Sequence, residues 1–537
     1  MAHDIVVADA TVVDGTGAPG YRTSVGVRDG RVAEIGPGLS GTAVIDADGL
    51  VLAPGFIDMH SHSDLVLLTE PEHLAKVSQG VTLEVIGQDG LSYAPVDDGV
   101  LGLLREQLAG WNGDPPGFDW NWRSVGEYLD RLDMGIAVHA AYLVPQGTVR
   151  MRHVGWADRP ATPAELDGMR SDVAEAMAQG AVGMSSGLTY PPGMYADTEE
   201  LVELCRVVAS AGGYYSPHHR GYGASAVANF AEMVDVSQRS GVSLHLAHAT
   251  MNFPVNAGRA GELLSLLDNA IDAGCDISLD TYPYLAGATY LAALLPSWAA
   301  EGGPATTRAR LSDVDTRDRI LVALEEIGSD GCHGVPVDWA TIEINGVRHR
   351  QLAHLVGHSV AESAARLGVP PGELYLDTLR DDELGTSCLM HVGDEANVRA
   401  IMRHRTHTGG SDGLLVGNQP HPRGWGTFPR YLGHYVRELG VLDLAECVAH
   451  LTSRPARRLG LTDRGVVRVG AVADLVLFDP ATIGDTATFT QPRQAAVGVH
   501  TVLVDGVRTL VDGQPTGALP GHSIRSIGGK ASDGLRR

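Results

Sequence analysis

The chain has 537 residues, 44% of them hydrophobic and 20% charged, which is typical of a globular enzyme large enough for more than one structural unit. Its formal net charge of −25 argues against a nucleic-acid partner, which would need a basic face. Because the sequence shows no membrane-length apolar stretch, no secretory signal and no Cys-x-x-Cys pair among its five cysteines, we expect a cytoplasmic enzyme without nucleic-acid or membrane partners.

Both ends of the chain carry short apolar runs separated by turn residues, and both are predicted to form short strands. Residues 24–28 lead through Asp29-Gly30 into a second apolar run, and residues 501–504 lead through Asp505-Gly506 into another. Two apolar runs joined by an Asp-Gly turn are typical of β-hairpins. We therefore expect one small β-sandwich domain formed from both termini, residues 1–54 plus 456–525.

The middle of the chain alternates predicted helices with short apolar strands. Thr162-Pro163 has the sequence of a helix start, and apolar residues then recur at helical spacing up to a strand-like run near residue 182. Three further helix-then-strand units follow between residues 199 and 280. This repetition predicts an α/β fold, a (β/α)8 TIM-like barrel. We place the barrel at residues 55–455, an insertion within it at about 292–350, and a flexible tail at 526–537.

Side chains of the kind that bind metals follow one predicted strand after another. The apolar run of residues 51–58 ends in His60-Ser61-His62, and on a strand two such histidines would project the same way, about 6.6 Å apart. With 22 histidines in the chain, roughly one such pair is expected by chance, so the pair needs its context. Later predicted strand ends carry Gln88-Asp89, His218-His219-Arg220, His245 and His248, Tyr282-Pro283-Tyr284, and Ser411-Asp412. Because the carboxyl ends of barrel strands meet at one face, we expect one shared site.

These stretches resemble the amidohydrolase superfamily, and more closely its N-acyl-D-amino-acid deacylase (D-aminoacylase) family. The matching motifs are residues 53–62, Gly80-Val81-Thr82, residues 187–193, Tyr282-Pro283-Tyr284, Gly410-Ser411-Asp412-Gly413, His421-Pro422-Arg423, Gly426-Thr427-Phe428 and residues 470–476. They are many, in order, and spread over nearly the whole chain. The resemblance implies hydrolysis of the amide bond of an N-acyl-D-amino acid, or of a related small N-acylated compound, by a metal-activated water.

The resemblance also implies one or two zinc ions. Carried over by position, the metal ligands are His60, His62, Asp89, His218, His248 and Asp412. The family usually has Gly-Asn-Cys-Gly where this chain has Gly-Gln-Asp-Gly, so Asp89 stands at the position of a cysteine. A carboxylate can bind zinc and bridge two ions, but it is a harder ligand than a thiolate.

Two other side chains are alternatives to Asp89 as the bridging group. Glu84 is a carboxylate on the same predicted strand, but it lies in mid-strand, away from the face where barrel sites form. A carboxylated lysine, the commoner bridge elsewhere in the superfamily, would have to come from Lys76 or Lys530, the only two lysines, and neither lies at a strand end. We therefore favour Asp89.

Asp412 is the candidate catalytic residue. It would take a proton from the water and pass it to the departing nitrogen, acting as base and then as acid; the competing interpretation is an ordinary turn carboxylate in Gly-Ser-Asp-Gly. The candidate substrate-binding residues are Tyr190, Thr250, Tyr282, Tyr284 and Arg423. Thr250 stands where the deacylases have a lysine that helps hold the substrate carboxylate, so the substrate could also be a blocked, peptidic or cyclic amide.

Two alternatives stay open at this point. One is a hydrolase or cyclase acting on a cyclic amide, and the other is a catalytically inert binding protein on the same fold. The sequence leaves the acyl group, the side-chain preference, the stereochemistry, the metal count and the formation of a homo-oligomer undetermined.

Overall fold

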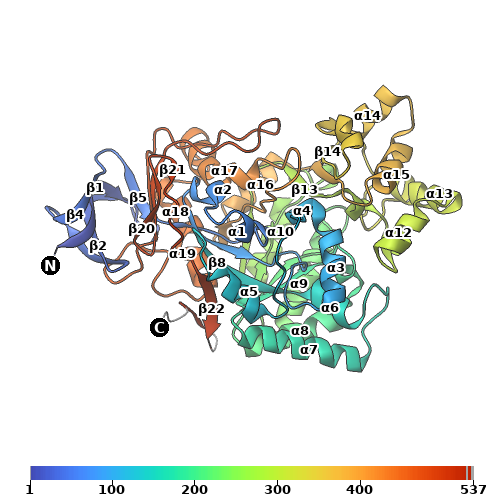
Figure 1. The fold of residues 1–537 in the computed structure, drawn as a ribbon, viewed down its shortest axis with the longest axis horizontal. Helices are drawn as coiled ribbons and strands as arrows, with labels where there is room; N and C mark the ends of the chain where they lie inside the picture. The colour runs from blue at the N-terminus through green and yellow to red at the C-terminus, as the bar shows by residue number, and fades with distance from the viewer. Residues whose placement is uncertain (1, 528–529, 534–537) are drawn as a thin grey trace.

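A barrel of eight parallel strands forms the centre of the molecule (Figure 1). The computed structural model describes residues 2–527 and 530–533. The barrel strands are β6 (Phe56–Asp58), β7 (Val81–Ile86), β8 (His139–Pro145), β9 (Gly183–Gly187), β10 (Tyr214–His218), β11 (Ser243–Leu246), β12 (Ile277–Thr281) and β17 (His407–Gly409). A β domain lies at one side of the barrel and a layer of helices and short strands at the other. The predicted (β/α)8 barrel with a small β domain from both termini is confirmed.

The first and last barrel strands meet through few hydrogen bonds. The backbone N–H of Met59 donates to the carbonyl of Gly409 at 3.1 Å, and Ser61 forms a single parallel bridge with Gly413. The other neighbours pair in chain order from β6 to β17. This closure places the segment after β6, with His60 and His62, beside the segment after β17, with Asp412.

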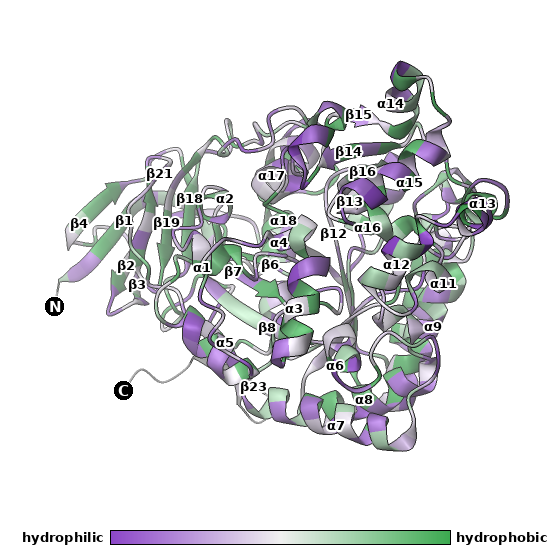
Figure 2. Cartoon of the chain, turned by 45° about the vertical axis from the view of Figure 1, so that its right-hand side comes forward, coloured by the Kyte–Doolittle hydropathy of each residue, from purple (hydrophilic) through white to green (hydrophobic). Residues whose placement is uncertain are grey.

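The helices that cover the barrel begin and end close to the predicted positions. They include α7 (Pro163–Ala178), α8 (Thr198–Ser210), α9 (Ala226–Ser240) and α10 (Ala260–Asp272). At the start of α7 the Thr162 hydroxyl accepts from the backbone N–H of Glu165, whose carboxylate accepts from the Thr162 N–H in return. Met169, Val173 and Met177 recur every fourth residue and are buried, so one face of α7 packs inward. Figure 2 shows hydrophilic and hydrophobic residues alternating along α7 and α8.

Both ends of the chain build the β domain. Its nine-stranded sheet contains β1 (His3–Val12), β2 (Tyr21–Arg28), β3 (Arg31–Gly36), β4 (Gly41–Asp46), β5 (Val51–Pro54), β18 (Leu475–Phe478), β19 (Val499–Val504), β20 (Val507–Val511) and β21 (Gln514–Pro515). β5 pairs antiparallel with β18, which sets Pro54 opposite Leu475. β19 and β20 form the hairpin predicted around Asp505-Gly506. Since β6 follows β5 after one residue, this sheet anchors the first strand of the barrel.

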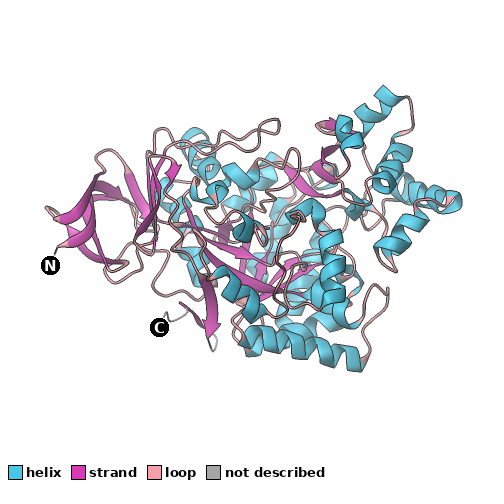
Figure 3. Cartoon of the chain, in the orientation of Figure 1, coloured by secondary structure: helices cyan, strands magenta, loops and turns pink. Residues whose placement is uncertain are grey.

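The segment between β12 and β17 is longer than the insertion expected at 292–350. It holds a four-stranded antiparallel sheet of β13 (Ala286–Tyr290), β16 (Ser387–His391), β14 (Ile342–Gly346) and β15 (His358–Ser359), and helices α11 (Ser297–Ala300), α12 (Pro304–Arg310), α13 (Val314–Val322), α14 (Val360–Leu367) and α15 (Pro371–Asp381). These elements share a core of their own around Ile344 and Tyr375. Figure 3 shows them on the side of the barrel away from the β domain.

Part of the segment predicted as a flexible tail is strand. Ser526 and Ile527 end β22 (Ser523–Ile527), which pairs with β8, and β23 (Lys530–Asp533) pairs with β22. Residues 528–529 and 534–537 of the predicted tail lie outside the described residues. Within the described ranges, no helix has both the length and the apolar character needed to cross a membrane.

Candidate metal centre

The structure brings together all six residues predicted to bind metal. They lie at the carboxyl ends of the barrel strands or in the loops that follow, and all are buried. His60, His62, Asp89 and Asp412 each offer a nitrogen or oxygen within 4.8 Å of the others, and so do Asp89, His218 and His248. Asp89 is thus common to two groups of ligands.

The Asp89 carboxylate lies among four imidazoles. Its Oδ1 is 3.5 Å from His60 Nε2 and 3.4 Å from His248 Nε2. Its Oδ2 is 3.5 Å from both His62 Nε2 and His218 Nδ1. Each oxygen therefore faces one histidine from each group. One carboxylate therefore lies within reach of both groups of ligands.

Several of these atoms are buried without a hydrogen-bond partner. Among the described residues, both ring nitrogens of His60 and Oδ1 of Asp89 make no hydrogen bond. Buried polar atoms in folded proteins are normally satisfied, and an exception calls for an explanation such as an ion. Imidazole nitrogens and carboxylate oxygens are suitable ligands for Zn²⁺. The donor set therefore fits one or two such ions.

Both central carboxyl groups are held in the ionised form. Burial acts to raise the pKa of Asp89, but the charges of His248, His60 and His218 outweigh it and keep that pKa well below its usual range. Burial likewise acts to raise the pKa of Asp412, and Arg423, whose Nη2 lies 2.8 Å from Asp412 Oδ2, is the main cause of its net lowering. Both groups are therefore ready to bind a cation or to accept a proton.

Hydroxyl groups behind two of the histidines orient their rings. The Thr189 hydroxyl is 2.7 Å from Nε2 of His218, and the Tyr222 hydroxyl is 2.8 Å from Nδ1 of His248. The opposite nitrogen of each ring consequently faces Asp89, and such outer contacts fix both orientation and basicity. Tyr222 was not predicted, because it lies in a loop after β10 and belongs to no motif.

Asp280, at the end of β12, is a second residue that the prediction missed. Its carboxylate accepts from the backbone N–H of His248 at 3.0 Å and lies 3.0 Å from His245 Nε2 and 3.7 Å from His60 Nδ1. It thus supports two candidate ligands from behind. Because it is a carboxylate near the carboxyl end of a barrel strand, the sequence alone could have indicated Asp280 as a site residue.

A pocket with about 510 Å³ of empty space, including space open to solvent, lies over Asp89 and Asp412. Three of the predicted substrate-binding residues line it: Tyr190, whose hydroxyl is 3.1 Å from Thr289 Oγ1, Thr250 and Tyr282. Trp111, which was not predicted, also lines it and packs against His62, with the ring centroids 4.9 Å apart and the ring planes tilted by 44°.

The other two predicted substrate-binding residues lie elsewhere. Arg423 is fully buried behind Asp412, with its guanidinium carbon 4.5 Å from the centre of the Tyr282 ring. Tyr284 is turned away from the cavity: its hydroxyl donates to Asp485 at 3.4 Å, and Arg430 covers its ring. Tyr284 therefore does not line the cavity as expected, because β12 ends at Thr281 and the residues after it no longer alternate on one strand face.

The sequence profile of the amidohydrolase family matches residues 43–510. The chain belongs to this family. It is similar to the D-aminoacylase of Alcaligenes xylosoxydans xylosoxydans, with 37% identity over 94% of this chain and 93% of the relative. It is also similar to the N-acyl-D-glutamate deacylase of that organism, with 34% identity over 97% and 96% of the two chains.

Solved structures show the same relationship. The crystal structure of N-acyl-D-glutamate deacylase from Bordetella bronchiseptica, complexed with zinc and a phosphonate inhibitor, matches with a TM-score of 0.84 and 32% identity over 98% of this chain and 100% of that chain. A crystal structure of D-aminoacylase matches with a TM-score of 0.82 and 34% identity over the same shares. The predicted resemblance is confirmed.

Three of the candidate ligands in this amidohydrolase have an unusual backbone. The φ angles of Asp89, His248 and Asp412 are 54°, 30° and 49°, in the left-handed region that residues other than glycine rarely adopt. Such conformations cost about 1–3 kcal/mol each and cluster at functional sites. Gly90 permits the turn after Asp89, since a Cβ there would lie 2.5 Å from the backbone nitrogen of Gly187.

A buried network of charged side chains contacts Ser411, the residue before Asp412, and so supports the loop that carries Asp412 in this amidohydrolase. Nζ of Lys76, in α2 (Leu74–Val77), donates to Asp58 Oδ2 at 2.5 Å and to Ser411 Oγ at 2.8 Å. The backbone N–H of Ser411 donates to Asp58 Oδ1 at 2.8 Å. Glu84, the alternative bridging residue, belongs to this network: its carboxylate lies 2.8 Å from His73 Nε2 and accepts from Ser63.

We predict that Asp89→Ala lowers the metal content of this amidohydrolase to less than one equivalent per chain. Removal of the shared carboxylate takes a ligand from both groups at once and leaves the group of His218 and His248 without a carboxylate ligand. Metal analysis of the purified variant measures the effect, and Glu84→Gln, which neutralises a neighbouring buried carboxylate outside both groups, is the control. Equal metal content in Asp89→Ala and the parent would show that Asp89 is not a ligand.

Proposed function

We propose that the chain hydrolyses the amide bond of an N-acyl-D-amino acid, or of a related N-acylated compound, with one or two zinc ions. The observation that carries the proposal is the Asp89 carboxylate shared by two groups of ligands. The similarity to D-aminoacylase and to N-acyl-D-glutamate deacylase over more than nine-tenths of the chain supports it. The proposed ligands are His60, His62, Asp89, His218, His248 and Asp412.

Asp412 is the proposed general base and acid. When bound, zinc supplies an activated water and polarises the scissile carbonyl. Oδ1 of Asp412 lies 3.1 Å from His62 Nε2 and Oδ2 is paired with Arg423, so the carboxylate is fixed at the floor of the cavity. Because Arg423 keeps it ionised, it starts the reaction able to accept a proton, which it then passes to the departing nitrogen.

The proposed substrate-binding residues are Tyr190, Thr250 and Tyr282, which line the cavity. In the described chain, Nε and Nη1 of Arg423 are buried without a hydrogen-bond partner, although its Nη2 is paired with Asp412. Arg423 lies behind Asp412 and does not line the cavity, so its proposed role is to hold Asp412 and the Tyr282 ring in place. Thr250 offers a neutral hydroxyl in the cavity, so we also expect activity on carboxyl-blocked amides.

The test is a substrate panel assayed on protein of known metal content. N-acyl D- and L-amino acids, free and carboxyl-blocked, are compared with cyclic amides, and products are identified as amine plus carboxylate or as opened ring. Release of amine from the D-compounds by a zinc-containing protein is expected. Ring opening alone would favour the cyclic-amide alternative, and protein that binds no metal and stays inactive after zinc addition would be an inert member of the family.

We further propose that the enzyme is cytoplasmic. All five cysteines are free, four of them buried, which agrees with a reducing compartment. Cell fractionation tests this location, and sedimentation analysis decides between a monomer and a homo-oligomer.

A further inference from the structure

A second cavity lies at the opposite ends of the barrel strands from the metal centre. Tyr214, the first residue of β10, lines this cavity, whereas His218, the last residue of the same strand, is a candidate metal ligand. Four steps along a parallel strand separate the two by about 13 Å. Ser243 and Ile277, the first residues of β11 and β12, line the same cavity. It is therefore separate from the proposed active site.

The cavity is rich in positive charge. Four arginines and one carboxylate line it: Arg405, Arg454, Arg457, Arg458 and Asp276. It encloses about 1060 Å³, including space open to solvent. The whole chain has 40 basic against 65 acidic residues, so an excess of arginine in one cavity runs against its overall charge. Such a local field attracts anions.

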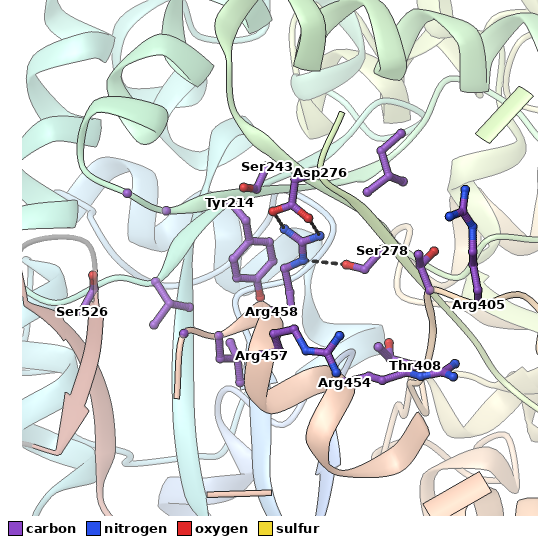
Figure 4. A pocket seen from close by; sticks show the side chains of 17 residues that line it. Tyr214, Ser243, Asp276, Ser278, Arg405, Thr408, Arg454, Arg457, Arg458 and Ser526 are labelled. Atoms are coloured by element: carbon purple, nitrogen blue, oxygen red, sulfur yellow. Dashed lines mark hydrogen bonds and ion pairs between the residues drawn. The ribbon is translucent and has the colours of Figure 1, made fainter. Parts of the chain in front are cut away.

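Three of the four arginines are held by carboxylates. Arg458 donates to both oxygens of Asp276, at 2.9 and 2.8 Å, and to Ser278, as the dashed lines in Figure 4 show. Arg405 is paired with Asp268 and Asp272, and Arg454 with Glu446. These last three carboxylates do not line the cavity. Their pairs therefore anchor Arg405 and Arg454 from outside and leave no carboxylate but Asp276 within it.

Arg457 has no such partner. It is exposed, and within the described chain it forms no ion pair and no side-chain hydrogen bond. Arg457 also lies near enough to Arg454 to affect its pKa. Burial lowers the pKa of Arg454, Glu446 acts to raise it, and the positive charge of Arg457 acts to lower it further. Arg454, Arg457 and Arg458 all come from α19 (Ser453–Arg458), and Figure 4 shows them around one space. An anion there would relieve the repulsion between Arg454 and Arg457.

We propose that this cavity binds a doubly charged tetrahedral oxyanion, either free phosphate or the phosphate group of a small metabolite, with Arg454 and Arg457 as its principal partners. The planar donor groups of arginine match the oxygens of phosphate. The inference does not depend on the proposed deacylase activity, because the metal centre is at the other end of the strands.

Titration calorimetry on the metal-loaded protein tests the proposal. Sodium sulfate is the first probe, because it has the shape of phosphate and binds zinc less readily, and sodium chloride at equal ionic strength is the reference. We expect saturable sulfate binding. Arg457→Gln and Arg454→Gln should each weaken it about tenfold, because each removes a charge-assisted hydrogen bond. Arg508→Gln removes the same charge from an exposed position on β20 and should change binding less than twofold.

A second arm with glycerol phosphate distinguishes the sources of the anion. Tighter binding of glycerol phosphate than of sulfate assigns the cavity to a phosphate ester, and equal binding assigns it to the free ion. Because Arg457 is exposed, Arg457→Gln should melt at the parent's temperature in chloride and hydrolyse substrate at the parent's rate, so a binding loss cannot come from unfolding. Sulfate and glycerol phosphate binding no more strongly than chloride, or equally in Arg457→Gln and the parent, would overturn the proposal.

Discussion

Asp412→Asn is expected to lower kcat for amide hydrolysis about 10²–10⁴-fold, the usual contribution of a positioned acid–base group. Asparagine has the same shape as aspartate but cannot accept the proton of the attacking water. Steady-state kinetics on the best substrate of the panel measure the loss, with metal content determined on the same sample. The other five proposed ligands remain, so most of the bound metal should be retained.

Asp485→Asn is the matched control for that experiment. Asp485 is also a carboxylate paired with an arginine, Arg430 at 3.2 Å, but it contacts Tyr284 outside the substrate cavity. Its kcat should stay within about twofold of the parent, as for most substitutions away from the reacting atoms. Full hydrolysis by Asp412→Asn would mean that another group moves the proton.

Lys76→Met is expected to lower the free energy of unfolding by about 3–5 kcal/mol, because it leaves the fully buried Asp58 and Glu84 without their shared cation. The same change releases Ser411, so kcat should fall as well. Urea denaturation followed by tryptophan fluorescence measures the stability. A double-mutant cycle with Asp58→Asn separates the pair from its surroundings, and the double variant should be more stable than the sum of single effects predicts. A loss below 1 kcal/mol in Lys76→Met would show that the network does not support the loop.

The effect of Lys76→Met should also depend on pH. Burial acts to raise the pKa of Glu84, but His73 and then Lys76 outweigh it and lower that pKa to about 2. A carboxyl group with a depressed pKa stabilises the fold fully above its unfolded-state value, near 4.5, and this contribution is lost as the pH falls toward 2. The stability difference between parent and variant should therefore shrink below pH 4.5.

The sequence was sufficient for the barrel and for one shared site at its strand ends, because both follow local rules, whereas the choice of His218 and His248 among neighbouring histidines came from the family resemblance. Apolar runs of strand length end in His60, Asp89, His218 and Asp412, and a barrel collects all strand ends at one face. The His60–His62 pair itself lies just after β6 rather than on it, yet both side chains reach the same centre.

Residues from loops could not be placed in the same way. Trp111 and Tyr222 reach the centre through tertiary packing, which no periodicity records. Tyr282 and Tyr284 have the i, i+2 spacing of side chains on one strand face, but the chain leaves the strand after Thr281, so only Tyr282 faces the cavity. The insertion was underestimated because β13 and β16 pair across about 100 residues of sequence.

The pairing of β5 with β18 also determines when the β domain can assemble during synthesis of the chain. Pro54 and Leu475 are neighbours in the sheet but about 420 residues apart in the chain. At a translation rate of roughly 5–20 residues per second, β5 waits for its partner for roughly 20–80 s. Throughout that interval the edge of β5 that later pairs with β18 is unpaired, and an unpaired strand edge can template aggregation. The strand that leads to His60 is therefore fixed in place only after residues 475–478 have left the ribosome, so recovery of active enzyme should depend on chaperones that shield that edge.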